Sequence, residues 1–460
     1  MKEQYDAIVV GAGIGGSIAG AYLAKSGLKT IVFEKTPWIG GRKYGSYKLG
    51  DISADKTCHI PLTAFTQNGG SGWWIKAAIE VGADIQWQAL PNTQICFNGH
   101  FITMPYCTSG RAFANFITGL MPLPEKDKKE LARVFDIAVG MPEEERYSRA
   151  MDEMPFRTWL DEKTDSVLVK ELFKILNDIS IVGGHDEASV TCTLGIMMAF
   201  LAGWANCCYM TDGTSDQLPK AFCRVTTDHG GQVLLKNAAT KVVIKNGQAK
   251  GVVVKDFEGT EKTYKAKYVL INACYDVLDE MLGLGGDMPQ EITAACQSMS
   301  RANEVIVEVH FALKKKIAHP VASQIIAVDK TMAYQGSILY PDHWVPSLSP
   351  PGKQIIQIER FLSPEEFKGR SLEGWTDHLR DVCEGVFPGL KNAIELEQTH
   401  VVSSPGGYYG FYYGPKVPVE CPGISNLYFV GDYTAAPGMV TERAASSAMI
   451  ATKKIIGERK

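Results

Sequence analysis

The sequence of 460 residues has no long hydrophobic run and no leader-like start. Its longest near-continuous apolar stretch, Leu194 to Ala205, is shorter than the roughly 20 residues that a membrane-spanning helix needs, so it predicts a buried core helix. The N-terminus enters a strand pattern without the charged and apolar segments of a signal peptide. We therefore expect a cytoplasmic protein without a transmembrane segment, and peripheral contact with a membrane stays open.

The sequence also has little excess charge of either sign. Its formal net charge is −4, and no basic run is longer than Lys314 to Lys316. Nucleic-acid binding normally requires a basic patch or stripe. The charge pattern therefore indicates no nucleic-acid partner, and the short basic run predicts a solvated turn.

No C-x-x-C pattern occurs, although the chain has 11 cysteines. They are scattered from Cys58 to Cys421, whereas thiolate metal sites need ligands clustered at fixed spacing. We expect no metal site and reduced, mostly buried thiols.

The composition is that of a globular protein, with 45% hydrophobic and 21% charged residues. A chain of this length is too long for one compact core. Two domains, possibly interleaved, are expected.

The first 34 residues have the pattern of a βαβ unit. An apolar, β-branched strand, Ala7–Val10, leads directly into a glycine-rich turn. A helix is predicted for Ser17–Lys25, Gly27 ends it, and a second apolar strand follows at Lys29–Phe33. This order of elements favours nucleotide binding, and the alternative is a glycine-rich turn in an ordinary α/β protein.

Each glycine of the G-x-G-x-x-G pattern has its own predicted task. Gly11 permits the tight turn, Gly13 lets a diphosphate approach the backbone, and Gly16 lets the helix pack close to the strands. The diphosphate is expected at the helix N-terminus, where free N–H groups and the helix dipole favour an anion. Glu34, at the end of the second strand, is placed to accept hydrogen bonds from both ribose hydroxyls and to repel a 2′-phosphate.

Two more glycines and an arginine follow soon after this acid, at Gly40-Gly41-Arg42. With them the sequence resembles the phytoene desaturase and flavin amine oxidase superfamily. The resemblance implies FAD as cofactor, with the G-G-R segment along its diphosphate and Arg42 in a charge-assisted contact with phosphate.

The resemblance extends to the C-terminus. Asn426–Asp432 predicts a buried strand that ends in Gly-Asp, and a helix is expected to begin in Pro437–Ile450. The family motif implies that Asp432 holds the ribityl or diphosphate region and that backbone N–H groups near Val440 and Thr441 face the N1/C2 edge of the flavin. Where relatives have E-G-A-x-x-S-G, Arg443 and Ala448 replace glycines. The full set of cofactor-contacting residues implied by the resemblance is Gly11, Gly13, Gly15, Gly16, Glu34, Lys35, Gly41, Arg42, Ala239, Gly431, Asp432, Val440 and Thr441.

The implied fold is of the α/β class: a Rossmann-like FAD-binding domain, made of a parallel sheet plus a β-meander, interleaved with an α+β substrate domain. The expected bounds are 1–85, 206–298 and 416–460 for the FAD-binding domain, and 86–205 and 299–415 for the substrate-binding domain. Asn98-Gly99 between two apolar runs predicts a hairpin near the start of the second domain.

No residue stands out as a catalytic base. His59 follows a segment that resembles the family stretch beside the flavin ring, so it is a candidate proton donor there, and the alternative is a hydrogen-bonded structural histidine. Tyr409 lies in the aromatic stretch Pro405–Pro415, which either walls a substrate cavity or stacks near the isoalloxazine, or else forms an aromatic surface turn. These two are the weak candidates.

The expected function is that of an FAD-dependent oxidoreductase of the phytoene desaturase type, which dehydrogenates, saturates or isomerises a carbon–carbon bond of an apolar small molecule with an unidentified electron acceptor. Amine oxidation is the first alternative, but Val440 stands where flavin amine oxidases have an aromatic residue. A non-catalytic prenyl-protein escort on the same fold is the other. Such proteins lose cofactor contacts, whereas Glu34, Arg42 and Asp432 are all present.

Overall fold

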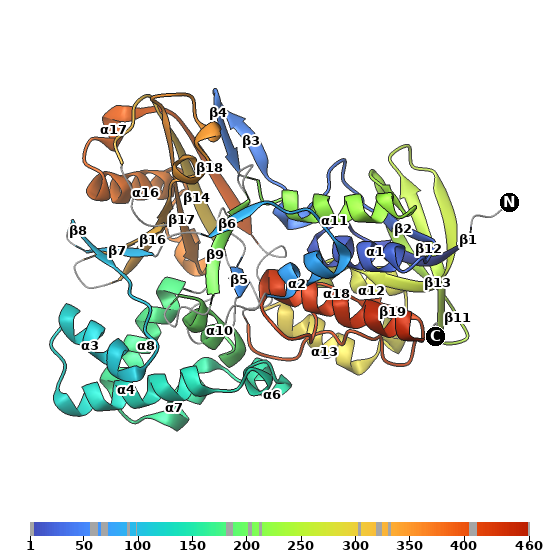
Figure 1. Cartoon of the computed structure of the whole chain (residues 1–460), viewed down its shortest axis with the longest axis horizontal. Helices are drawn as coiled ribbons and strands as arrows, with labels where there is room; N and C mark the ends of the chain where they lie inside the picture. The colour runs from blue at the N-terminus through green and yellow to red at the C-terminus, as the bar shows by residue number, and fades with distance from the viewer. Residues whose placement is uncertain are drawn as a thin grey trace.

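The computed structural model describes residues 4–55, 63–65, 72–89, 93–97, 99–180, 187–200, 205–210, 214–301, 305–318, 324–329, 333–403 and 412–458. Within these ranges the strands form two large sheets that lie side by side, with a group of helices below the second one (Figure 1). The catalytic candidates His59 and Tyr409 lie outside the described residues.

The first large sheet contains the predicted βαβ unit. Strands β1 (Gln4–Val10) and β2 (Thr30–Phe33) pair in parallel, with α1 (Ile14–Lys25) between them in the chain. The strand order is β10-β2-β1-β13-β12-β11, and β19 also pairs with β13. The remaining strands of this sheet are β10 (Gln232–Leu234), β11 (Asn237–Lys245), β12 (Gln248–Asp256), β13 (Glu261–Ile271) and β19 (Leu427–Phe429).

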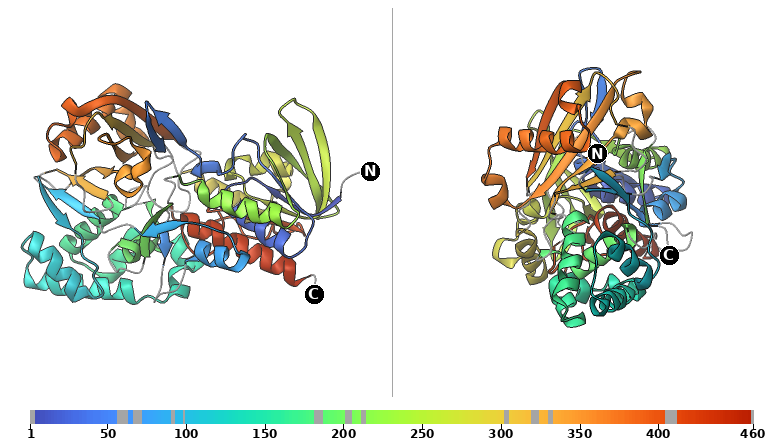
Figure 2. Two further views of the ribbon diagram at one scale, coloured as in Figure 1. Left: turned by 45° about the horizontal axis from the view of Figure 1, so that its top comes forward. Right: turned by 90° about the vertical axis from the view of Figure 1, so that its left-hand side faces the viewer.

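This sheet combines two kinds of pairing. β10, β2, β1, β13 and β19 run parallel, whereas β11, β12 and β13 form an antiparallel meander. Helix α1 packs against α11 (Gln217–Asp228) and α18 (Val440–Gly457), and α18 also packs against α2 (Trp73–Val81). The first and last segments of the chain are therefore neighbours, as the blue and red ribbons show in Figure 2. The predicted α/β class is confirmed.

The second large sheet is mixed, with strand order β18-β14-β17-β16-β15-β7-β8. The predicted hairpin is present, because β7 and β8 pair antiparallel on either side of Gly99. Helix α16 (Leu372–Val386) packs on β14, β16 and β17. The strands are β7 (Gln94–Phe97), β8 (His100–Thr103), β14 (Val305–Leu313), β15 (Gln324–Val328), β16 (Tyr334–Leu339), β17 (Gln354–Leu362) and β18 (Ile394–Ser403).

A helical layer packs under the β7 and β15 end of this sheet. It shares one apolar cluster with Ile95 and Ile326 of the sheet. Its main helices are α3 (Gly110–Leu120), α4 (Glu125–Gly140), α7 (Phe156–Lys163), α8 (Val167–Ser180) and α10 (Val190–Phe200). The prediction of a single helix over Leu194–Ala205 was wrong, because α10 ends at Phe200 and Ala205 begins strand β9 (Ala205–Met210).

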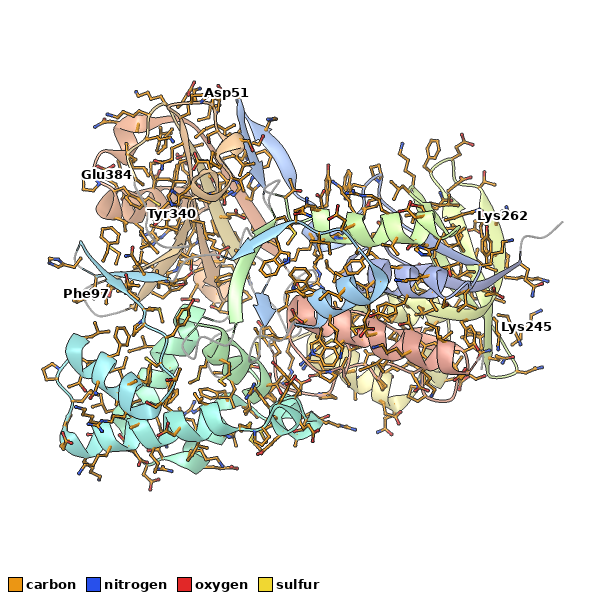
Figure 3. The ribbon with its side chains drawn as sticks, viewed as in Figure 1. Asp51, Phe97, Lys245, Lys262, Tyr340 and Glu384 are labelled. Atoms are coloured by element: carbon orange, nitrogen blue, oxygen red, sulfur yellow. The ribbon has the colours of Figure 1, made fainter. Side chains whose placement is uncertain are left out.

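A small hairpin lies between the two sheets, formed by β3 (Ser46–Leu49) and β4 (Ile52–Asp55). Its tip is held to the second sheet where Lys353 Nζ contacts Asp51 Oδ1 at 3.1 Å. In Figure 3, Asp51 lies at this tip, and Glu384 of α16 lies on the opposite, outer side of the second sheet. The hairpin and α16 thus cover different faces of the sheet.

The shorter elements complete the described chain. They are η1 (Gly41–Lys43), β5 (Thr63–Phe65), β6 (Trp87–Ala89), α5 (Glu143–Arg146), α6 (Arg149–Glu153), η2 (Tyr275–Val277), α12 (Leu278–Leu282), η3 (Gly285–Asp287), α13 (Gln290–Met299), α14 (Pro341–Trp344), η4 (Pro346–Leu348), α15 (Pro364–Lys368) and α17 (Leu390–Ala393).

Among the described helices, none combines the length and apolar character that a bilayer crossing requires. The part of the chain that the structure covers also contains no cluster of His, Cys, Asp or Glu suited to a metal ion. The cysteines with described side chains are free thiols, and most of them are buried.

Candidate functional site

The glycine turn after β1 is closed by backbone contacts. Gly11 adopts φ +91°, and its N–H donates to Phe33 O at 2.7 Å. A Cβ on Gly16 would lie 1.9 Å from Gly11 O, so α1 approaches the turn too closely for any side chain there. The helix begins at Ile14, earlier than the predicted Ser17, so Gly15 and Gly16 form its first turn.

The end of β19 meets this turn. A Cβ on Gly15 would lie 3.0 Å from Gly431 N, and Gly431 itself adopts φ +141° and donates its N–H to Ser447 Oγ at 2.9 Å. Asn272, which follows β13, joins the two ends of the chain: its amide oxygen accepts from Gly16 N at 3.1 Å and its NH₂ donates to Val430 O at 3.0 Å. The residues of the N-terminal and C-terminal motifs are therefore in one place.

The Glu34 carboxylate is buried beside the glycine turn. One oxygen accepts from Ala12 N at 2.8 Å, and the other accepts from Thr36 N and Thr36 Oγ1, each at 2.9 Å. A carboxylate has about four acceptor positions, so this one still has capacity for a further donor. Glu34 thus fixes the turn and keeps negative charge at its rim.

The predicted neighbours of Glu34 differ in their exposure. Lys35 is exposed to solvent. Ala239 is half-buried on β11, two residues after Asn237, whose N–H donates to Glu34 O at 2.9 Å. The start of the meander therefore lies next to the acid.

Gly41, Arg42 and Asp432 lie on the other side of the turn. Gly41 adopts φ +56°, and a Cβ there would be 3.5 Å from Gly13 Cα. Arg42 forms an ion pair with Asp432 Oδ1 across 390 residues of sequence. Asp432 is 3% exposed, and its Oδ2 has no hydrogen-bond partner among the described residues. A buried carboxylate oxygen of this kind is suited to accept from a ligand hydroxyl.

Helix α18 begins in a strained turn at the same place. Val440 adopts φ +46°, which is rare for a β-branched residue, after Gly438 at φ +102°. Conformations of this kind cost about 1–3 kcal/mol and occur mostly at functional sites. The next residue, Thr441, is buried in the first turn of the helix, where free N–H groups and the helix dipole favour negative charge.

These features fit a flavin adenine dinucleotide. The glycine turn and the first turn of α1 offer donors for a diphosphate, Glu34 and Asp432 offer acceptors for hydroxyl groups, and Arg42 offers a cation. The sequence prediction did not include Asn272. The sequence pattern that could have revealed Asn272 is a polar residue directly after a buried strand of a parallel sheet, because ligands bind at the carboxyl edge of such sheets.

Removing the Glu34 carboxylate is expected to weaken FAD binding by about 1–3 kcal/mol. The Ala12 N–H loses the oxygen that accepts its hydrogen bond, and the proposed ribose hydroxyls lose theirs. Titration of the apoprotein with FAD, followed by flavin fluorescence, measures the effect of Glu34→Ala. Glu34→Gln, which keeps one acceptor oxygen, is the matched control and should lose less. An unchanged dissociation constant in Glu34→Ala would place the adenosine elsewhere.

Glu442 joins α18 to α2. It is fully buried, and its Oε2 accepts from Trp73 N at the start of α2. Burial raises the pKa of Glu442 to about 8 from its ordinary value of 4.5, and the Trp73 and Trp74 N–H groups oppose this rise. Between these two pKa values the Glu442 carboxyl is therefore protonated in the folded protein and ionised in the unfolded chain.

This difference predicts a pH dependence of stability. Between the unfolded and folded pKa values the folded state binds more protons, so the contribution of Glu442 to the free energy of unfolding falls as the pH rises from about 5 to 8. Glu442→Gln should remove the fall, and its stability relative to the parent should rise by up to about 4 kcal/mol over this range. Urea unfolding at several pH values measures it, and a constant difference would contradict the prediction.

Arg443, which replaces a glycine of the family motif, has its side chain inside the protein. It is 1% exposed; its Nε donates to Gly438 O and its Nη2 to Asp152 Oδ1, both at 2.9 Å. Lys416 is buried nearby and donates to Tyr412 O at 2.7 Å. Burial lowers the pKa of Lys416 to about 8, while the negative charge of Asp152 opposes the fall. Asp152 of α6 therefore forms an ion pair with Arg443 and provides negative charge near Lys416. Through Arg443 it connects α6 to the turn before α18.

The aromatic stretch Pro405–Pro415 is described only from Tyr412 onwards. Tyr412 is buried in the cluster that contains Ala188, Cys192 and Met439. Tyr413 packs under the guanidinium of Arg301, with 4.6 Å between the guanidinium carbon and the ring centre. In the described part of this stretch, Tyr412 belongs to the core, whereas Tyr413 is partly exposed beside the exposed Arg301.

Comparison with known proteins agrees with this geometry. The family model for flavin-containing amine oxidoreductases matches residues 14–456. Prolycopene isomerase 2 of an Oncidium hybrid cultivar is 23% identical over 99% of this chain and 84% of its own length. The 15-cis-phytoene desaturase of Solanum lycopersicum is 23% identical over 94% of this chain and 74% of its own length.

Solved structures share the fold. An oxidoreductase from Methanosarcina mazei superposes with a TM-score of 0.72 at 19% identity, covering 98% of this chain and 100% of that one. Because the family model covers nearly the whole sequence, the chain belongs to the family of flavin-containing amine oxidoreductases.

Proposed function

We propose that this FAD-dependent oxidoreductase acts on a carbon–carbon bond of an apolar small molecule, in the manner of the phytoene desaturases. The observation that carries the proposal is the convergence of the glycine turn, Arg42 and Asp432 with the turn Pro437–Val440, which has the desaturase form and lacks the aromatic residue of amine oxidases. The names of the desaturase and isomerase relatives support the same class of substrate.

In this proposal the bound FAD supplies a hydride acceptor. Glu34 holds the ribose, and the N-terminus of α1 with Arg42 holds the diphosphate. Asp432 would accept from a hydroxyl group of the ribityl chain through its second oxygen. The first turn of α18, at Val440 and Thr441, stabilises negative charge on the reduced cofactor.

The proposed division of labour follows the two sheets. Residues 1–85, 206–298 and 416–460 form the FAD-binding domain, and residues 86–205 and 299–415 the substrate-binding domain. Their separate sheets support this division, since the first large sheet takes no strand from 86–205 or 299–415 among the described residues.

Amine oxidation is the second candidate, because the family model that matches the chain is that of flavin-containing amine oxidoreductases. Val440 argues against amine oxidation, because it stands where flavin amine oxidases have an aromatic residue. Anaerobic mixing of the oxidised protein with 15-cis-phytoene, prolycopene, and a set of primary amines separates the two, with bleaching of the flavin spectrum as readout. Bleaching by the polyenes supports the proposal, and bleaching by amines alone replaces it.

A cofactor-free escort is tested by the same preparation. If the purified protein is colourless and takes up no added FAD, the escort function replaces both enzymatic ones. Photoreduction without oxygen, followed by reoxidation with candidate acceptors, then identifies the electron acceptor of a yellow protein.

A further inference from the structure

Strand β14 has two faces of different character. Val307, Val309 and Phe311 point toward α16 and pack with Trp375 and Leu379. The residues between them point to the other face, because side chains alternate along a strand. Two of these are Glu308 and His310, which are 1% and 0% exposed. A polar patch is thus buried on the face opposite α16.

The neighbouring strands extend this patch. Glu308 is paired directly with Glu359 of β17 and with His400 of β18, and His310 with Gln357 of β17. Glu359 and Gln357 are 0% and 1% exposed. Two carboxylates opposite each other repel if both are charged, and a proton held within the patch removes that repulsion.

Hydrogen bonds connect the patch to the β3–β4 hairpin. His310 Nε2 bonds Glu308 Oε1, and His310 Nδ1 lies 2.6 Å from Tyr47 Oη on β3. The Tyr47 and His310 rings stack with centroids 5.7 Å apart. Tyr47 is only partly buried. A continuous line of proton-carrying groups therefore runs from a buried carboxylate to a partly exposed phenol.

The position of the patch relates it to the proposed flavin site. At one end of the same face, Ala312 and Ile355 pack with Leu49 and Ile52 of the hairpin. At the other end, Phe361 packs on the apolar cluster that contains Met439, on which Val440 also packs. On this face the Glu308–Glu359 pair is the neighbour of the Ile306–Phe361 pair, two residues along each strand. The patch lies between the hairpin and the apolar cluster to which the turn that begins α18 belongs.

We propose that Glu308, His310 and Tyr47 form the proton relay of the dehydrogenation, with Glu308 as the catalytic base. This inference rests on the proposed function. One C–H bond of the substrate breaks with transfer of hydride to FAD, and the neighbouring C–H bond gives its proton to the Glu308 carboxylate while the electron pair forms the C=C bond. At rest His310 carries its ring proton on Nδ1, which donates to Tyr47 Oη, so that Nε2 can accept a proton. Glu308 passes the substrate proton to His310 Nε2, His310 passes its Nδ1 proton to Tyr47, and Tyr47 releases its own proton to solvent; His310 returns to the Nδ1–H tautomer before the next turnover.

The other groups that face the relay have supporting roles. Glu359 and Gln357 come from β17, His400 from β18 and Tyr47 from β3. His400 meets the rings of both His310 and Tyr47 edge-on, with centroids 5.1 Å apart in each case. His400 and Glu359 therefore contribute to any pH dependence measured for the relay.

The experiment measures anaerobic flavin reduction by 15-cis-phytoene in rapid mixing. Glu308→Gln is expected to slow reduction by about 10²–10⁴-fold and to change the pH dependence of the rate, and Glu308→Asp to restore part of the rate. His310→Asn and Tyr47→Phe should slow reduction without a change in FAD affinity or melting temperature. Asp342→Asn, a buried carboxyl of the same domain outside the relay, is the matched control and should keep the parental rate.

A substrate-free measurement guards against misfolded variants. The Nδ1 proton that His310 donates to Tyr47 should give a low-field proton resonance that is lost in His310→Asn and altered in Tyr47→Phe. Absence of this resonance from the parent, or parental reduction rates in Glu308→Gln, would overturn the relay while the proposed function stands. A parent that 15-cis-phytoene does not reduce at all would overturn the proposed function and the relay with it.

Discussion

Replacing Gly13 by valine is expected to give a folded protein that carries no FAD. Gly13 lies between Gly41 and Asn272: a Cβ on Gly41 would be 3.5 Å from Gly13 Cα, and a Cβ on Gly13 would be 2.9 Å from the amide group of the Asn272 side chain. Valine adds two methyl groups beyond that Cβ, in the space in front of α1 where the diphosphate is expected. The nearest obstacle is a side chain and not backbone, so the fold can adjust while the cofactor cannot.

The ratio of flavin to protein absorbance in the purified variant measures this loss, with circular dichroism to show that the chain is folded. Gly119→Val is the control, because a Cβ at Gly119 in α3 meets no atom within 4 Å. Gly16→Val is the contrasting variant: its Cβ would strike Gly11 O, so folding itself should fail. Full flavin occupancy in Gly13→Val would contradict the proposed position of the diphosphate.

Replacing Asp152 by asparagine is expected to lower the free energy of unfolding by about 3–5 kcal/mol, because it leaves the buried Arg443 without its counter-charge. Lys416, which is also buried, loses the same negative charge. The effect should be largest for the segment that joins α6 to the turn before α18, because Arg443 holds Gly438 O and Asp152 at once.

Urea unfolding followed by tryptophan fluorescence measures this change. Glu153→Gln is the matched control on the same helix: Glu153 pairs with Arg149, whose side chain is 77% exposed, so its loss should cost less than about 1 kcal/mol. Replacing Asp152 and Arg443 together by leucine and methionine should recover the part of the loss that is due to Arg443, while Lys416 still lacks the negative charge of Asp152. Equal losses of unfolding free energy in Asp152→Asn and Glu153→Gln would show that the buried Asp152–Arg443 pair stabilises the fold no more than the exposed pair does.

The parts of the fold that the sequence predicted are those with a local cause. The βαβ unit follows from a buried strand, a glycine turn and a helix in direct succession, and its existence was predicted correctly. The start of its helix was predicted incorrectly, at Ser17, whereas α1 begins at Ile14. Gly15 and Gly16 are held in the helix by close contacts with Gly431 and Gly11, which no local sequence pattern reveals. The Asn98-Gly99 hairpin was predicted for the same local reason.

The parts that were missed depend on contacts between distant segments. Arg443 and Asp152 are 291 residues apart, so the sequence could show only that an arginine had replaced a glycine. Glu308 and His310 alternate with valines, a pattern that normally indicates a strand with one solvated face. Their burial follows from the neighbouring strands and from Tyr47 of the hairpin, which the periodicity of one strand cannot show.

The most direct test of the account is a titration of the apoprotein with FAD and with FMN. In the proposed arrangement Glu34 and the glycine turn bind the adenosine and diphosphate, and Asp432 and the start of α18 bind the flavin half, so both ends of the chain should be needed for tight binding. We expect one FAD per chain and binding of FMN weaker by at least about 100-fold, or about 2.7 kcal/mol. Equal affinity for FMN, or no binding of FAD, would contradict it.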